Sequence, residues 1–263
     1  MKRFSGKALS ERLYKSFLAW SLFIGLWEWS IYTGILKSML LAPPTVIIEK
    51  MLYFLEKGYL QINIAASLGR FFAGFVIAIL IAIPLGLILG LFKRLYEWIS
   101  PLLNFIRLIP PPAILPFAII LLGIGESPAV FVIALGSFFP ILMNTVQGVK
   151  ETETIHLEVV KTMGGNRVDL IRHVIFPSAI PTVMTGIRIG FGIGWLVLVS
   201  SEVVAADSGL GFMLEGARNL LETPTIFVGM TTICILGLMI DVFLKRIERF
   251  FILRKGGGYL TYN

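Results

Sequence analysis

The chain has 263 residues, of which 56% are hydrophobic and only 15% are charged, and its mean hydropathy is +0.85. This composition excludes an ordinary soluble globular domain. The formal net charge of +7 would suit a nucleic-acid partner, but the positive residues lie mostly in the tails and in alternate loops, which argues against one. The single cysteine, Cys234, lies in an apolar run. It excludes an internal disulfide, suggests no metal cluster, and is expected to be a small buried residue.

Apolar runs of about 20 residues, the length that crosses a bilayer as a helix, recur along the chain. The first is interpreted as a retained span, because it is too long for a signal-peptide core and lacks a clear small-residue cleavage site. Residues 42–57 have an apolar face and are expected to lie along the membrane surface. Prolines at 110–112 and 116 interrupt the third run, and residues 206–224 are a glycine-containing loop in which a short re-entrant helix is expected. The predicted spans are residues 17–36, 67–92, 98–122, 128–149, 178–205 and 225–244.

Lysine and arginine residues divide unequally between the two sides that six spans define. Sixteen lie in the tails, after the second span and in the polar segment 150–177, whereas four lie in the opposite loops. The positive-inside rule therefore predicts that both termini and the polar segment are cytoplasmic. The expected organisation is a basic N-terminal segment at residues 1–16, one transmembrane domain at 17–244 and a basic tail at 245–263.

The polar segment 150–177 is predicted to form two short helices with a glycine hinge. Apolar residues three apart mark one helix face, and Gly164 and Gly165 end that helix because glycine adopts the left-handed cap conformation. Asn166 can cap the next helix, and Asp169 suits its positive N-terminal end. Pro177 is expected to close the segment before the next apolar run. An amphipathic hairpin with basic residues between two spans is suited to binding by another protein.

The same segment resembles the EAA loop of bacterial ABC importer permeases. Glu158-Val159-Val160 is followed by a glycine six residues after the glutamate and then by Phe176-Pro177. Valines stand where the family has alanines, which keeps the side chains small or medium and apolar. In that family the loop forms coupling helices that dock into a groove on the ATPase subunit. The resemblance therefore implies ATPase coupling by Glu158, Val159, Val160, Gly164, Gly165 and Pro177.

The resemblance to these permeases covers residues 41–244 and is closest to the branch that serves sulfonate, taurine, nitrate and bicarbonate importers. It rests on residues 41–45 (LAPPT), 106–111 (IRLIPP), 138–144 (FFPILMN) and 201–211 (SEVVAADSGLG). It implies an all-α polytopic membrane protein of about six transmembrane helices with a cytoplasmic coupling-helix hairpin, as in type I ABC importer permeases. The implied location is the bacterial cytoplasmic (inner) membrane.

The function that this resemblance implies is passage of a small oxyanion by alternating access. The chain would work as a homodimer with two ATPase subunits and an extracytoplasmic solute-binding protein. ATP and Mg would belong to the ATPase, because this chain has no G-x-x-x-x-G-K-[ST] loop. Permeases for heterocyclic vitamin precursors or other small organic solutes are the alternative. A stand-alone secondary transporter is a weaker one, since intramembrane acidic pairs and an internal repeat are not found.

Polar and proline residues in or beside the spans are candidates for the path or its gate, because an ionisable group at the bilayer centre costs about 2.5–3.5 kcal/mol. Arg188 lies about 15 Å into its span, where a positive charge would suit an oxyanion. Alternatively, Arg188 pairs with Glu202 or caps freed carbonyls. Arg107 precedes the proline-broken stretch and could instead satisfy carbonyls there. The candidates are Arg107, Pro110, Pro111, Asn144, Arg188, Glu202, Ser208 and Gly209.

Several further residues are expected to have mainly structural roles. Arg70 and Asp241 are expected to snorkel near span ends, and Glu28 is expected to be a packing or interface residue. The stretch from Ser208 to Gly211 is interpreted as a flexible gate, a receiving surface for the binding protein, or a tight turn into a short helix. His156 and His173 lack a carboxylate or cysteine cluster, so no metal site or catalysis is expected. Close packing at a subunit interface is expected for Gly186, Gly190, Gly192 and Gly194.

Overall fold

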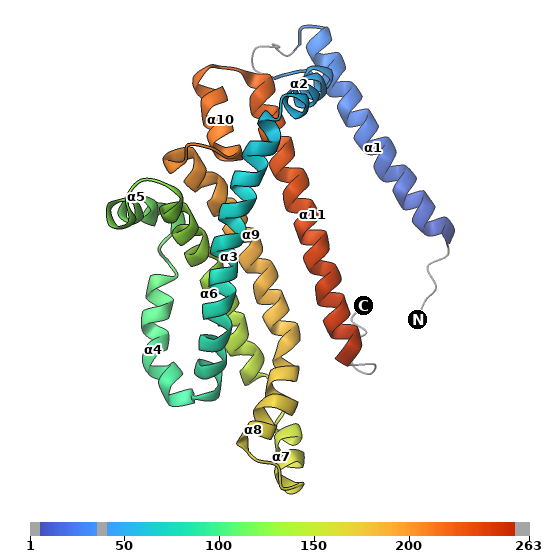
Figure 1. Ribbon diagram of the computed structural model, residues 1–263. Coiled ribbons are helices and arrows are strands. Elements are labelled where there is room, and N and C mark those ends of the chain that lie inside the picture. Colours follow the sequence, from blue (N-terminus) through green and yellow to red (C-terminus); the bar gives the residue numbers. More distant parts are fainter. Residues whose placement is uncertain (1–5, 36–40, 256–263) are drawn as a thin grey trace. The chain divides into compact units, whose positions relative to one another are not determined.

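The computed structural model describes residues 6–35 and 41–255, and these ranges contain helices and no strand (Figure 1). The expected all-α class is therefore confirmed. Lys2, Arg3 and Lys37, which entered the charge count, lie outside the described residues. The helices are α1 (Gly6–Tyr32), α2 (Pro44–Glu56), α3 (Tyr59–Leu91), α4 (Lys93–Ile106), α5 (Pro111–Leu122), α6 (Glu126–Lys150), α7 (Thr154–Thr162), α8 (Arg167–Leu170), α9 (Phe176–Ala205), α10 (Leu210–Asn219) and α11 (Thr223–Lys255), with a π-helical turn (Ile171–Ile175) before α9.

Membrane-spanning length and apolarity are found in four segments, Tyr59–Leu91, Glu126–Lys150, Val168–Ala205 and Thr223–Phe250. The pair α4 and α5 makes a fifth span if it is counted as one, bent by 91°. The bend follows Arg107, where the prolines were expected to break the helix, whereas Pro116 lies inside α5 without ending it. Helix α1 covers most of the expected first span, residues 17–36, and its crossing of the membrane stays a prediction.

The chain divides into two compact units, and the smaller comprises residues up to Ile62 together with Met213–Thr232. In this unit the carboxylate of Glu28 in α1 accepts hydrogen bonds from the amide (3.2 Å) and the hydroxyl (2.8 Å) of Thr45, in the first turn of α2. Amides in the first turn of a helix have no partner within it, so Glu28 caps α2. This role is more specific than the packing role expected for it.

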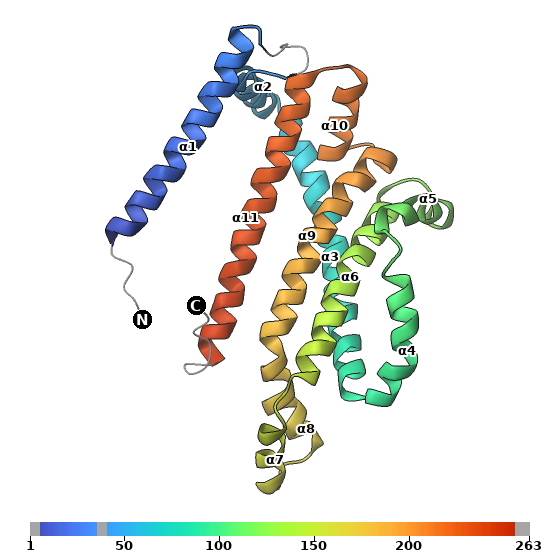
Figure 2. The same cartoon turned by 180° about the vertical axis from the view of Figure 1, so that it is seen from behind.

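The larger unit, Asn63–Phe212 and the chain from Ile233 on, is built around α6 and α9, which run side by side in both views (Figures 1 and 2). Glycines four residues apart on α9 permit this approach. A Cβ on Gly186 would lie 3.1 Å from the carbonyl oxygen of Pro140, and one on Gly190 would lie 2.9 Å from that of Ser137. Small residues allow such close contact between membrane helices.

The expectation that these glycines pack at a subunit interface is wrong for three of the four. Gly186, Gly190 and Gly194 face side chains and carbonyls of α6 in the same chain, whereas Gly192 has no atom within 4 Å of its added Cβ. The expectation for Cys234 is also wrong, because its side chain is exposed in the chain. An apolar run does not reveal which of its residues face other helices and which face outward.

The hairpin follows the predicted local pattern but not the predicted break from the next span. Gly164 has a left-handed φ of +79°, and the side-chain oxygen of Asn166 accepts the amides of Val168 (2.8 Å) and Asp169 (3.0 Å). The carboxylate of Asp169 accepts the amide of Asn166 in return (3.0 Å), which completes a capping box. However, α8 continues through the π-helical turn into α9, so Pro177 lies in the first turn of α9 and closes nothing.

Candidate functional site

A cavity of about 330 Å³ opens in the larger unit where the bend between α4 and α5 faces α6 and α9. It forms there because proline-rich backbone ends α4 and starts α5 at a new angle, with Pro110 as the N-cap and Pro111 as the first residue of α5. Its size is at the lower end of the range for small-molecule sites. Its lining residues are Arg107, Ile109, Pro111, Leu135, Gly136, Phe139, Pro140, Met143, Asn144, Ile189 and Ile193.

Arg107 is the one charged residue in this lining. Arg107 is the C-cap residue of α4, and no carboxylate among the described residues lies at ion-pair distance from its guanidinium. The other polar side chain is that of Asn144, whose Nδ2 donates to the carbonyl of Pro140 (2.8 Å). A guanidinium with free donors on an apolar wall is suited to a small anion, because it offers planar, charge-assisted hydrogen bonds to oxygen atoms.

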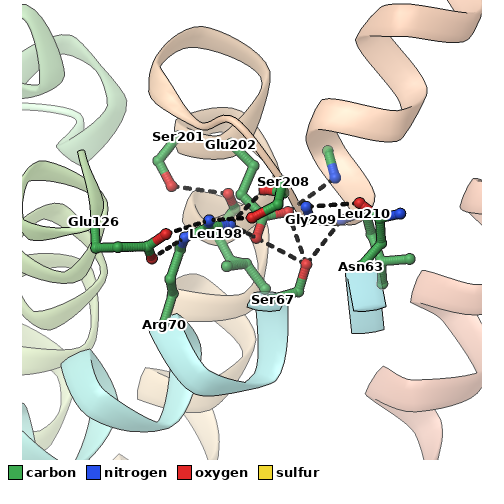
Figure 3. A network of polar contacts seen from close by, with 11 residues as sticks. Asn63, Ser67, Arg70, Glu126, Leu198, Ser201, Glu202, Ser208, Gly209 and Leu210 are labelled. Carbon is green, nitrogen blue, oxygen red and sulfur yellow. Dashed lines mark hydrogen bonds and ion pairs between the residues drawn. The ribbon is translucent and has the colours of Figure 1, made fainter. Parts of the chain in front are cut away.

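A second polar group, centred on Arg70 of α3, lies in the same unit (Figure 3). Its Nε donates to Glu126 Oε2, and its Nη2 donates to Glu126 Oε1 (2.6 Å) and to the hydroxyl of Ser208 (2.9 Å). Its Nη1 donates to Glu202 Oε1 (2.8 Å) and to the carbonyl of Ser208 (2.6 Å). All five guanidinium N–H donors are therefore used. The side chains of Arg70 and Glu202 are 2% and 0% exposed, so the expectation that Arg70 snorkels is wrong.

The same group holds the start of α10. The amides of Gly209, Leu210 and Gly211 donate to Asn63 Oδ1, Ser67 Oγ and Glu202 Oε2, each at 2.8 Å. The first amides of a helix lack partners within it, and here α3 and α9 supply those partners. Of the interpretations given for residues 208–211, the tight turn into a short helix is confirmed, and the turn uses a φ of +116° at Gly209.

Arg188 does not reach Glu202, and the pairing predicted between them is wrong. Its Nη1 lies 3.0 Å from Glu248 Oε2 and its Nε lies 3.6 Å from Asp241 Oδ1, both on α11. Asp241 also forms an ion pair with Lys245, whose Nζ lies 2.5 Å from Asp241 Oδ2. Asp241 is therefore a partner in an ion-pair group between α9 and α11, not a side chain that snorkels alone. A separate cavity of about 320 Å³ adjoins this group.

The hairpin presents apolar side chains outward. Val159 is 51% exposed, Met163 is 82% exposed and Val168 is 66% exposed. Glu158 is also exposed, and Gly165 packs so close to Val160 that a Cβ would lie 2.5 Å from its Cγ1. His173 is exposed, and its Nδ1 lies 3.2 Å from the carbonyl oxygen of Asp169. The side chain of His156 lies outside the described residues.

The predicted path residues thus fall into three places. Arg107, Pro111 and Asn144 line one cavity, Glu202, Ser208 and Gly209 belong to the Arg70 group, and Arg188 lies with α11. Sequence reasoning missed the members Asn63, Ser67, Arg70 and Glu126. The available signal was Arg70 itself, since a charge inside an apolar run needs a partner and Glu126 and Glu202 lie at the ends of neighbouring spans.

Comparison with known proteins gives the family. Residues 82–253 match the family described as binding-protein-dependent transport system inner membrane component. A probable ABC transporter permease of Brucella melitensis biotype 1 is 37% identical over 232 residues, which cover 88% of this chain and 93% of that protein. The taurine transport system permease protein TauC of Escherichia coli K12 is 32% identical over 247 residues, which cover 92% of this chain and 90% of that protein.

The fold also resembles a solved structure, the inward-facing MetNI methionine ABC transporter. The TM-score is 0.64 at 21% identity, with 77% of this chain and 98% of that chain covered. At that identity the likeness concerns the fold alone, and it agrees with the type I importer fold that the sequence implied. From the family match and these relatives, the chain belongs to the binding-protein-dependent transport system inner membrane components, the multi-pass permease subunits of ABC importers.

Proposed function

We propose that this permease carries a small oxyanion, such as an alkanesulfonate, taurine, nitrate or bicarbonate, through the cavity beside Arg107. Two copies of the chain form the path, two ATPase subunits bind ATP and Mg, and an external binding protein delivers the solute. A relative with 32% identity is named as a taurine permease, which supports an oxyanion as the substrate class.

The observation that carries this proposal is the state of Arg107. Its guanidinium lines a cavity whose other lining residues are apolar or neutral, and no described carboxylate pairs with it. The side chain is exposed, so its donors are open to an anion that enters from water, and they can give it planar, charge-assisted hydrogen bonds. A volume of about 330 Å³ is large enough to hold a small organic or inorganic oxyanion.

The exposed hairpin supports the second part of the proposal, docking of the ATPase. Val159, Met163 and Val168 expose apolar surface on a segment whose second helix is capped by Asn166 and Asp169. Exposed apolar surface of this kind marks a protein interaction site when it is not in lipid. Sixteen lysines and arginines lie in this segment, in both tails and after the second predicted span, against four in the opposite loops, which supports a cytoplasmic position for the segment and the tails.

Uptake by the reconstituted importer tests the role of Arg107. The complex of permease, ATPase and binding protein is placed in liposomes, and entry of radiolabelled taurine, nitrate and bicarbonate is measured. Arg107→Gln should lower uptake of the accepted anion about tenfold or more, because a hydrogen bond to a charged group contributes roughly 1.5–3 kcal/mol. Arg107→Lys should retain part of it.

The matched control is Arg94→Gln, since the Arg94 side chain is exposed near the start of α4 and does not line the cavity. It removes the same charge and should leave uptake unchanged. Normal anion uptake by Arg107→Gln would contradict the proposed path. Selective uptake of a neutral heterocycle by the wild type would contradict the oxyanion class.

A further inference from the structure

The Arg70 group joins four helices at one point. Arg70 and Ser67 belong to α3, Glu126 is the first residue of α6, Glu202 lies in the last turn of α9, and residues 209–211 start α10. Figure 3 shows these side chains converging from separate helices on the guanidinium. Hydrogen bonds of Arg70 and Glu202 link the interior of α3 to one end each of α6, α9 and α10, so none of these segments can shift alone without losing charge-assisted bonds.

The two carboxylates that Arg70 holds differ in their surroundings. The side chain of Glu202 is 0% exposed and also accepts hydrogen bonds from Ser67 and Gly211, so its position in the group is fixed. Glu126 is 65% exposed and its described hydrogen bonds go to Arg70. The connection to α6 is therefore the one that can be altered without leaving a buried charge unpaired.

The helix that carries Glu202 also reaches the hairpin. The span Val168–Ala205 is continuous in its helical structure, with one π-helical turn at Ile171–Ile175. From this turn to Glu202 the distance is roughly 45 Å at 1.5 Å per residue. α6 packs along the same helix through Gly186 and Gly190 and lines the cavity with Asn144. A continuous helix and a second helix packed along it thus connect the Arg70 group with the hairpin and with the cavity.

We propose that Arg70 is a positioning residue of the transport cycle. It couples the start of α10 to α6 and α9, so that a binding protein seated on the outer loops changes ATP hydrolysis at the far end of α9. This inference rests on the proposed importer function and orientation. If closure of the ATPase moves the outer face through α9, occupation of the outer face must in turn shift the equilibrium between the open and closed ATPase, because coupling between two equilibria is reciprocal.

The test compares basal ATPase activity with the activity stimulated by the loaded binding protein, in the complete complex in nanodiscs. Glu126→Gln removes the charge on the exposed arm and places an amide group against a guanidinium donor, while the buried pair of Arg70 with Glu202 stays intact. Basal activity should be unchanged, and the stimulation factor should fall about threefold or more, within the range of measured coupling effects. Glu126→Asp, which keeps the charge, should retain more of the stimulation than Glu126→Gln.

The matched control is Glu97→Gln, since Glu97 makes a solvent-exposed pair with Lys93 within α4. It should leave both activities unchanged. A stimulation factor in Glu126→Gln equal to that of the wild type would overturn the inference and leave the importer function standing. So would a parallel fall of basal activity, stimulated activity and thermal midpoint, which is the signature of a merely structural role. A wild-type complex that the binding protein does not stimulate would contradict the proposed function itself.

Discussion

Alanine substitutions at two glycines of α9 test whether close packing against α6 sets the stability of this permease. A Cβ on Gly190 would lie 2.9 Å from Ile141 Cγ1 and 2.9 Å from the carbonyl oxygen of Ser137, whereas a Cβ on Gly192 has nothing within 4 Å. The two positions lie two residues apart on the same helix, so they share backbone conformation and depth. They differ in what the new methyl group meets.

The expected magnitudes follow from two opposing terms. Alanine is favoured over glycine in a helix by about 1 kcal/mol, which applies at both positions. Overpacking at Gly190 costs about 1–3 kcal/mol, because one of the two atoms is backbone and cannot rotate aside. Gly192→Ala should therefore be neutral or stabilising by about 1 kcal/mol, and Gly190→Ala should be less stable than Gly192→Ala by about 1–3 kcal/mol.

The assay is thermal unfolding of the purified protein in detergent, followed by tryptophan fluorescence. At about 2–4 °C per kcal/mol for a chain of this size, the midpoints of the two variants should differ by about 2–12 °C. Size-exclusion chromatography is run beside it, because a glycine at a subunit interface would change the oligomeric state instead. Equal midpoints for the two variants would refute the packing argument.

Two other predictions concern the hairpin and the smaller unit. Gly164→Asp, at a left-handed φ of +79°, should reduce co-purification of the ATPase while membrane insertion survives. The control Gly34→Asp, at a φ of +75° outside the hairpin, should leave co-purification unchanged. Equal recovery of the ATPase with both variants would contradict docking at the hairpin. Lys50 lowers the pKa of the Glu222 carboxyl through its hydrogen bond (2.5 Å). A carboxyl group whose pKa is lower in the folded state stabilises the fold at pH values above its unfolded-state pKa of about 4.3. This stabilisation is lost as the pH falls through the folded-state pKa. The difference in Tm between wild type and Glu222→Gln should therefore shrink from pH 7 to about pH 3, and a constant difference would contradict this assignment.

Features fixed by neighbours in sequence could be predicted. The Asn166 cap and its return bond from Asp169 depend on residues three apart, and the glycine after α7 follows from the left-handed conformation that ends a helix. The break before Pro110 follows from the missing amide hydrogens of prolines. Such patterns act within one or two helical turns, so no tertiary information is needed to find them.

Partners across the fold could not be predicted in the same way. Arg70 and Glu202 are 132 residues apart in the chain, and apolar periodicity says nothing about which helices meet. Helical geometry does exclude one wrong pairing. Arg188 and Glu202 lie on one continuous helix, 14 residues apart, which places them roughly 21 Å apart along its axis. Both residues therefore needed partners on other helices, and α11 and α3 supply them.

The three arginines within the predicted spans can be assigned roles by the acceptors that surround them. Arg70 has every donor occupied by fixed protein oxygens, and such a charge can hold helices together but cannot bind a passing solute. Arg188 has two carboxylates on α11, so an anion would have to displace them. Arg107 has a cavity in front of it and no described carboxylate partner. Because the Arg107 side chain is exposed and no described carboxylate occupies its donors, an oxyanion can reach it without displacing a protein partner, and so gains most at Arg107.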